Sequence, residues 1–371
     1  MTGLTLSGGG FRATLFHAGA LWRLNELGLL KNIDEITSVS GGSIIAAYLG
    51  YKWNELLFES NNVATNFVEL IVTPITDFCS HTIDVGTIIG GIINPVKHPS
   101  ELLISRYRKH LFGDSTLQDL PGTKIGPRFT LYSTSMQTGA SVRLTRDYLG
   151  EYHLGKIMKP TLLLAVAVAA SSAFPPPLCP VKVKTDADAW QESEISDLHT
   201  DKYLKSIMWL VDGGVYDNLG LERVVKNCDT ILVSDAGAPF SIHRKMICSR
   251  ISQIARTKRT LDIMSEQIRA LRTRDLIDKY ENNIKKGAYW GIATNIDEYP
   301  LKKNNLPSAL VQDSKTTRAI AEIRTRLNKF HAKEQGQLIN WGYSLADAAL
   351  RSYVDSSLPP ASKLPCDEYP I

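Results

Sequence analysis

The 371-residue chain has no run of apolar residues long enough to cross a bilayer. Its longest apolar run, residues 162–170, is about half of the ~18–20 residues that a spanning helix needs. The N-terminus lacks a basic region, an apolar region and a small-residue cleavage site, so the sequence predicts no secretory signal peptide. We therefore expect a cytoplasmic protein, with peripheral membrane contact and non-classical secretion left open.

Cysteine is scarce. The five cysteines are odd in number, scattered and without metal-ligand spacing, which indicates reduced thiols and predicts no metal site; they are Cys79, Cys179, Cys228, Cys248 and Cys366.

Charge is close to balanced, and the net charge of +4 favours anionic partners only weakly. Residues 241–280 differ, because ten Lys and Arg stand there against four Asp and Glu. This basic block lacks the interleaved aromatic residues of a nucleic-acid-binding module, so we expect no nucleic-acid partner. It fits either attraction to an anionic membrane surface or a solvated helix face.

The chain does contain an alternation of strand and helix patterns, which favours an α/β fold. Two buried strands, each followed by a helix, are predicted within the first fifty residues; the predicted strands are 3–7, 36–39, 129–133, 207–211 and 231–234. No repeat or linker requires a second domain. We expect one domain over residues 1–371, in which residues 3–235 form the core that carries the motifs. A mostly helical extension, residues 236–371, packs on that core, with residues 307–354 predicted as helical.

An apolar run within residues 85–96 is broken by glycines and a proline. It fits either a mobile lid that touches acyl chains or a buried insertion, and the sequence alone leaves both open.

A glycine-rich turn joins the first predicted strand to the first helix. Gly8, Gly9 and Gly10 allow backbone N–H groups to converge at a helix N-terminus, where they stabilise an anion. In acyl transfer that anion is the tetrahedral oxyanion, for which one donor contributes ~3 kcal/mol. The same residues fit a dinucleotide fingerprint, Gly8-x-Gly10-x-x-Ala13. That fingerprint requires an acidic residue at the end of the second strand. The strand ends instead at Ser40, which disfavours a nucleotide.

Residues 37–43, Thr-Ser-Val-Ser-Gly-Gly-Ser, predict a strand that turns sharply into a helix with Ser40 at the turn. The segment approximates the nucleophile elbow G-x-S-x-G, in which small neighbours such as Gly42 permit the strained backbone that exposes the serine oxygen. Ser38 replaces the first glycine, and Ser38 and Ser43 are rival hydroxyls. Taken alone, Ser40 fits a helix N-cap equally well.

Asp212 ends an apolar strand and is followed by two glycines. In α/β folds this position lies at the carboxyl edge of the sheet, where active sites are found. An isolated Asp-Gly is more commonly a cap or turn, although Asp217 and Asn218 suit that role better.

Together these segments resemble the patatin-like phospholipase family, whose signature is G-G-G-x-R, then G-x-S-x-G, then D-G-[GA]. A fourth stretch, residues 169–176 (Ala-Ala-Ser-Ser-Ala-Phe-Pro-Pro), looks like the small-residue helix end and proline of that family. The resemblance covers roughly residues 3–235. It implies a three-layer α/β/α fold with a mainly parallel central sheet.

The resemblance also implies the site. It makes Ser40 the nucleophile and Asp212 its base, with Gly42 supporting the elbow. The oxyanion hole is then formed by the first motif, namely Gly8, Gly9, Gly10 and Arg12. The family uses a Ser-Asp dyad without histidine, metal or cofactor. Among the histidines, His17 lies in the first helical pattern and is expected to be a packed or hydrogen-bonded core residue.

The implied function is a lipid acyl hydrolase of phospholipase A or lysophospholipase type that acts on membranes from the aqueous side. One alternative is a non-lipid esterase or thioesterase with the same chemistry. The other is a regulated effector whose hydrolase activity is latent until a partner or ligand binds. The sequence leaves the lipid head group, the acyl position and any activating protein open.

Overall fold

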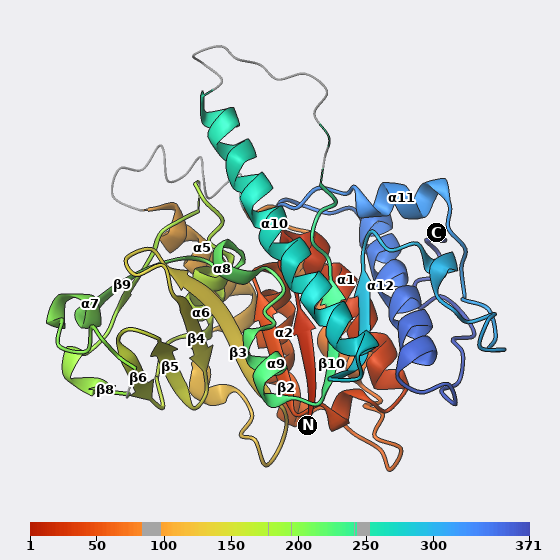
Figure 1. The fold of residues 1–371 in the computed structure, drawn as a ribbon, viewed down its shortest axis with the longest axis horizontal. Coiled ribbons are helices and arrows are strands. Elements are labelled where there is room, and N and C mark those ends of the chain that lie inside the picture. The colour runs from red at the N-terminus through yellow and green to blue at the C-terminus, as the bar shows by residue number, and fades with distance from the viewer. Residues whose placement is uncertain (84–97, 177, 194, 241, 243–252) are drawn as a thin grey trace.

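The structure is a computed structural model that describes residues 1–83, 98–176, 178–193, 195–240, 242 and 253–371 (Figure 1). The segment 85–96, considered above as a lid or insertion, lies outside these residues. The described strands form one eleven-stranded sheet. They are β1 (Thr2–Leu6), β2 (Glu35–Val39), β3 (Arg128–Ser135), β4 (Ser141–Thr145), β5 (Tyr148–Glu151), β6 (Gly155–Met158), β7 (Val181–Lys184), β8 (Trp190–Gln191), β9 (Ile207–Asp212), β10 (Thr230–Asp235) and β11 (Lys286–Gly291).

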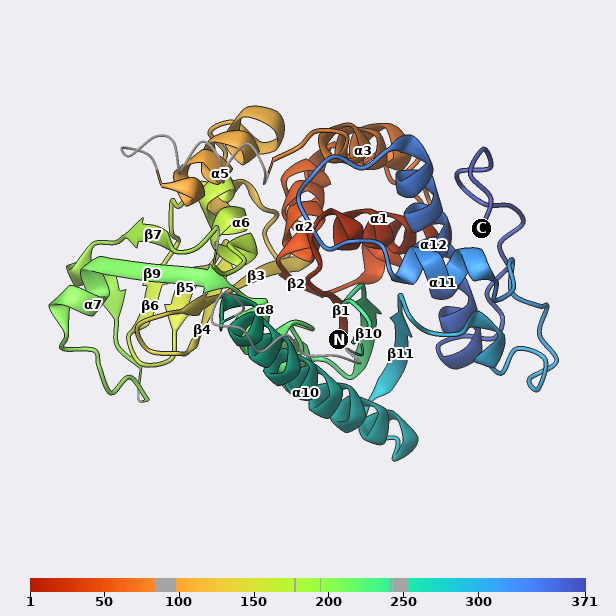
Figure 2. The ribbon, with the colours of Figure 1, turned by 90° about the horizontal axis from the view of Figure 1, so that it is seen from above.

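Helices cover both faces of this sheet, as Figure 2 shows from above. The described α-helices are α1 (Gly10–Glu26), α2 (Gly41–Lys52), α3 (Thr73–Cys79), α5 (Pro99–Tyr107), α6 (Leu164–Ser172), α7 (Lys202–Ser206), α8 (Gly214–Asp217), α9 (Glu222–Asn227), α10 (Gln253–Glu281), α11 (Lys315–Ala321) and α12 (Ala332–Tyr353). α1 packs extensively on α12 over one face. On the other face, Val224 of α9 and Leu276 of α10 form an apolar cluster with Ile231 and Val233 of β10. The expected three-layer α/β/α architecture is confirmed.

The central part of the sheet is parallel, with the order β11-β10-β1-β2-β3. β1, β2 and β10 are buried almost throughout, as expected of parallel strands with helices on both faces. Beyond β3 the sheet continues antiparallel through β4, β5, β6 and β8. The sequence analysis did not predict β4 to β8, which have two to five residues each.

The C-terminal extension differs from the expected run of helix in two places. β11 adds an edge strand beside β10, and its Trp290 is fully buried. Residues 307–354 form two helices, α11 and α12, that are separated by residues 322–331. Residues 322–330 of this separating segment, which we call the covering segment, contact the glycine turn.

Some sequence expectations concern the chain as a whole. Among the helices that the structure describes, none is long and apolar enough to span a membrane. Of the five cysteines, the four outside the undescribed segments, Cys79, Cys179, Cys228 and Cys366, are free thiols.

Candidate active site

The glycine turn connects β1 to α1 at the carboxyl edge of the sheet. Gly9 and Gly10 have φ values of 152° and 57°, a region that favours glycine. The N–H of Gly8 donates to the carbonyl of Asn218 (3.1 Å), and that of Phe11 donates to the carbonyl of Arg326 (3.1 Å). Within the described part of the chain, the N–H groups of Gly9 and Gly10 have no acceptor. These two donors are therefore available to an anion.

Ser40 lies between β2 and α2 in a strained conformation, with φ 50° and ψ −119°. Such a backbone is costly for a residue with a side chain and is typical of a nucleophile elbow. Its side chain makes no capping hydrogen bond to α2, so the N-cap interpretation is not realised. A Cβ atom on Gly42 would lie 2.3 Å from the carbonyl oxygen of Leu6, so only glycine allows α2 to start this close to β1.

The rival hydroxyls of Ser38 and Ser43 are fully buried and bonded to one another. Ser38 Oγ lies 3.0 Å from Ser43 Oγ, which in turn lies 2.8 Å from Ser171 Oγ at the end of α6. Ser171 Oγ also accepts the backbone N–H of Ser40 at 3.0 Å. Ser40 keeps a small exposed fraction of 8%. Of the three serines in the elbow motif, Ser40 is therefore the one placed to react.

The strand pairing of β3 brings Asp212 to the elbow. β2 runs parallel to β3 and ends with Val39 opposite Tyr132. β9 runs antiparallel to β3 and ends with Asp212 opposite Ser133. Ser133 also pairs with β4, so β9 occupies the same edge of β3 as β2. The two strands therefore run toward each other and meet end to end at Ser40 and Asp212.

The Asp212 carboxyl group is buried, and burial raises its pKa to about 6. The Gly214 N–H, which donates to Oδ1 at 2.7 Å, and the Ser40 hydroxyl both act to lower this pKa, but burial outweighs them. Oδ2 has no hydrogen-bond partner of ordinary geometry among the described residues. The Ser40 hydroxyl is nevertheless close enough to the carboxylate to lower its pKa.

Arg12 is buried and donates to backbone carbonyls on two sides. One guanidinium nitrogen bonds the carbonyl of Ala236 (2.5 Å), and the other bonds that of Ile323 (2.8 Å) in the covering segment. Burial lowers its pKa to about 10. These contacts tie the covering segment to β10 and α1. They give Arg12 a structural task, whereas the oxyanion role inferred for it from the motif stays a prediction.

The covering segment lies directly against the glycine turn. A Cβ on Gly10 would lie 2.8 Å from the carbonyl oxygen of Arg326, and Phe11 packs edge-on against Phe330. The Leu327 carbonyl also accepts the N–H of Ile83 at 2.8 Å. The extension therefore forms part of the wall of the site, which sequence motifs did not predict.

His17 is fully buried in α1, as expected of a core residue. Its ring nitrogens lie 2.8 Å from Ser234 Oγ and 2.9 Å from the Ser7 carbonyl. Burial lowers its pKa to about 4, so it is neutral at pH 7. These contacts leave no ring nitrogen for Ser40 or Asp212.

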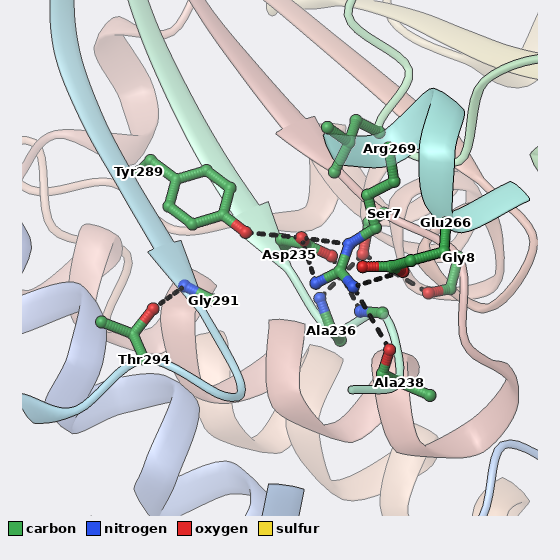
Figure 3. A network of polar contacts seen from close by, with 12 residues as sticks. Ser7, Gly8, Asp235, Ala236, Ala238, Glu266, Arg269, Tyr289, Gly291 and Thr294 are labelled. Carbon is green, nitrogen blue, oxygen red and sulfur yellow. Dashed lines mark hydrogen bonds and ion pairs between the residues drawn. The ribbon is translucent and has the colours of Figure 1, made fainter. Parts of the chain in front are cut away.

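A second buried carboxylate, Asp235, ends β10 near the glycine turn (Figure 3). Burial alone would raise its pKa, but the pKa is lowered because Arg269 of α10 and the Tyr289 hydroxyl bind it. Arg269 Nε and the Tyr289 hydroxyl donate to Oδ2 at 2.9 and 2.6 Å. Asp235 is therefore a charged anchor for α10 near neutral pH, with its carboxylate already bound by Arg269 and Tyr289.

The fold and site define a class: an α/β protein with a strained serine at a strand-to-helix turn, facing a buried carboxylate beside a glycine turn. The family model for patatin-like phospholipase matches residues 4–225. The chain belongs to the patatin-like phospholipase family, as the sequence motifs indicated.

A solved structure supports this fold. Human GIVD cytosolic phospholipase A2 is similar with a TM-score of 0.52 and 11% identity, over 94% of this chain and 61% of that chain. The chain thus spans about three fifths of the length of that structure. VipD from Legionella pneumophila matches with a TM-score of 0.35 and 15% identity, over 93% of this chain and 66% of that chain. No curated protein sequence matches this chain significantly.

Proposed function

We propose that the protein is a lipid acyl hydrolase of phospholipase A or lysophospholipase type, with a Ser40–Asp212 dyad. The observation that carries the proposal is the end-to-end meeting of β2 and β9, which sets a strained serine against a buried carboxylate. Membership of the patatin-like phospholipase family supports an ester of a lipid as the substrate.

In the proposed mechanism, Asp212 accepts the proton of Ser40 as Oγ attacks the ester carbonyl carbon. The N–H groups of Gly9 and Gly10 stabilise the oxyanion, since both are available and both lie at the N-terminus of α1. Collapse of the tetrahedral intermediate releases the alcohol, which takes the proton from Asp212, and leaves an acyl-Ser40 ester. Water then attacks this ester, and the same carboxylate accepts its proton. Collapse of this second intermediate breaks the bond from the acyl carbon to Ser40 Oγ, which takes the proton back from Asp212 as the fatty acid leaves.

We further propose that the N-terminal part of α10 contacts anionic membrane surfaces. At this end the helix extends beyond the body of the molecule (Figure 1). It exposes Leu261, Ile263 and Met264 by 42–56% and carries basic side chains, among them Arg256 and Arg259. Apolar and basic side chains on one helix favour an anionic lipid interface. The residues 241–252 of the basic block lie largely outside the described residues.

The test is fatty acid release from phosphatidylcholine vesicles containing phosphatidylserine, measured beside Ser40→Ala and Asp212→Asn. We expect both variants to lose at least ~10²-fold in rate, because general base and nucleophile act as a unit. Ser172→Ala, which removes a buried hydroxyl that bonds Tyr107 and the Val168 carbonyl, serves as a comparison and should retain far more activity. If Ser40→Ala hydrolyses lipid like the wild type, the dyad is wrong. If wild type cleaves only soluble esters, the non-lipid esterase is the correct function.

A further inference from the structure

We propose that Ser171 is a positioning residue that aligns the nucleophile with its base. It occupies the last turn of α6 and is fully buried. Its Oγ accepts the backbone N–H of Ser40 at 3.0 Å, while its carbonyl oxygen accepts the backbone N–H of Gly213 at 3.2 Å. One residue thus holds both the turn that carries the nucleophile and the turn that follows Asp212. This inference rests on the proposed Ser40–Asp212 mechanism.

Further hydrogen bonds hold the backbone around Asp212 in place. The backbone N–H of Asp212 donates to the carbonyl of Ala173 at 3.1 Å. Ser133 Oγ lies on β3 opposite Asp212 and is bonded to the carbonyls of Ala170 (2.9 Å) and Val211 (2.8 Å). The end of α6 is therefore fastened to β9 by several bonds, and among the described residues the Ser171 hydroxyl extends this frame to the backbone of Ser40.

The hydroxyl of Ser171 can accept one hydrogen bond and donate another at the same time. A serine oxygen can accept hydrogen bonds while its single proton is donated elsewhere. With the Ser40 N–H as donor to Oγ, the proton of Ser171 can point to Ser43 Oγ at 2.8 Å, and that of Ser43 to Ser38 Oγ at 3.0 Å. This chain of buried hydroxyls fixes Ser171 Oγ in place. The Ser40 N–H therefore has a rigid acceptor.

That acceptor matters because Ser40 holds a backbone conformation that residues with side chains rarely adopt. The orientation of the Ser40 peptide sets the direction of its Cα–Cβ bond and thus the path of Oγ toward Asp212. Without the acceptor, the buried N–H is unsatisfied, and the peptide relieves this by rotating away. A displacement of ~1 Å of a reacting atom is enough to cost ~10²-fold in rate.

The experiment compares Ser171→Ala with Ser172→Ala on a soluble short-chain ester, so that membrane binding plays no part. Ser172 is the matched control, because it is an equally buried hydroxyl on the same helix. It bonds Tyr107 and the Val168 carbonyl instead of either turn. For wild type and each variant we measure kcat, KM, the rate at which a fluorophosphonate labels Ser40, and the thermal midpoint of unfolding. Ser171→Thr, which restores a hydroxyl, is the rescue variant.

We expect Ser171→Ala to lose about 10–100-fold in kcat and in labelling rate, with KM changed by less than about threefold. Ser171→Thr should recover part of the loss, and Ser172→Ala should stay within about threefold of wild type. Equal kcat in Ser171→Ala and wild type would overturn the inference, as would an equal loss in Ser172→Ala at the same thermal midpoint. A wild type that cleaves no ester and resists the fluorophosphonate would instead refute the proposed function itself.

Discussion

Ser40 and Asp212 lie at the ends of two strands that run toward each other along the same edge of β3. The proposed nucleophile follows a strand parallel to β3, and the proposed base ends an antiparallel one. Both residues are thus held at strand ends of a single hydrogen-bonded sheet. Such a rigid support suits a catalytic pair, since small displacements of the reacting atoms are costly.

The raised pKa of Asp212 predicts the pH dependence of the reaction. The carboxylate must be ionised to accept the proton of Ser40, and its pKa in the free protein is about 6. We expect kcat/KM for a soluble ester to fall about tenfold per pH unit below that value and to level off above it. A pH profile from 4.5 to 8.5 measures this. A profile that stays level down to pH 4.5, as an ordinary carboxyl group would give, would show that burial does not govern the base.

The same pKa predicts that Asp212 destabilises the folded protein. Its pKa is raised from an ordinary value of 3.8, so the folded state binds the proton more tightly than the unfolded state does. This tighter proton binding stabilises the folded state at low pH, and the stabilisation is lost as the pH rises through 6. Above pH 6 the buried charge lowers the free energy of unfolding by up to about 3 kcal/mol. Asp212→Asn should therefore raise the free energy of unfolding at pH 8 while leaving it nearly unchanged at pH 4.

Urea unfolding at the two pH values measures this effect. Asp367→Asn is the control, because Asp367 is exposed. A variant Asp212→Asn that is less stable than wild type at pH 8 would contradict the sign of the pKa shift.

Arg12 is predicted to hold the covering segment. Arg12→Gln shortens the side chain and removes the guanidinium bonds to Ala236 and Ile323. We expect a loss of about 3 kcal/mol in the free energy of unfolding, faster proteolysis within residues 322–330 and reduced ester hydrolysis. Arg318→Gln on α11 is the matched control, because Arg318 is exposed. If both variants behave alike, the covering segment does not depend on Arg12.

The proposed membrane contact of α10 predicts a selective loss of vesicle binding. Changing Leu261 and Met264 together to Glu removes exposed apolar surface and adds negative charge to the helix. Sedimentation with phosphatidylserine-containing vesicles should show binding at least about tenfold weaker, and wild-type binding should weaken as salt is raised. Leu57→Glu, an exposed leucine outside α10, is the control. Soluble-ester hydrolysis should stay unchanged in all variants. Undiminished vesicle binding by the double variant would refute a lipid contact at α10.

The sequence by itself determined the local chemistry of this protein. The glycine turn, the small residues around Ser40 and the strand that ends at Asp212 are short-range patterns, because backbone strain and strand-to-turn transitions select particular residues within a few positions. The parallel strands β1, β2 and β10 were equally predictable, since each is a short segment with apolar residues that runs into a turn or helix signal.

Only the tertiary structure decided how these parts meet. The direction of β9 along β3, the bond from Ser40 to Ser171 and the use of Arg12 to hold residues 322–330 join positions far apart in the chain. The antiparallel strands β4 to β8 and the edge strand β11 escaped prediction as well. Short strands take their partners from the sheet around them, and a buried polar group takes whichever partner the fold brings within reach, so neither leaves a periodic signal in its own sequence.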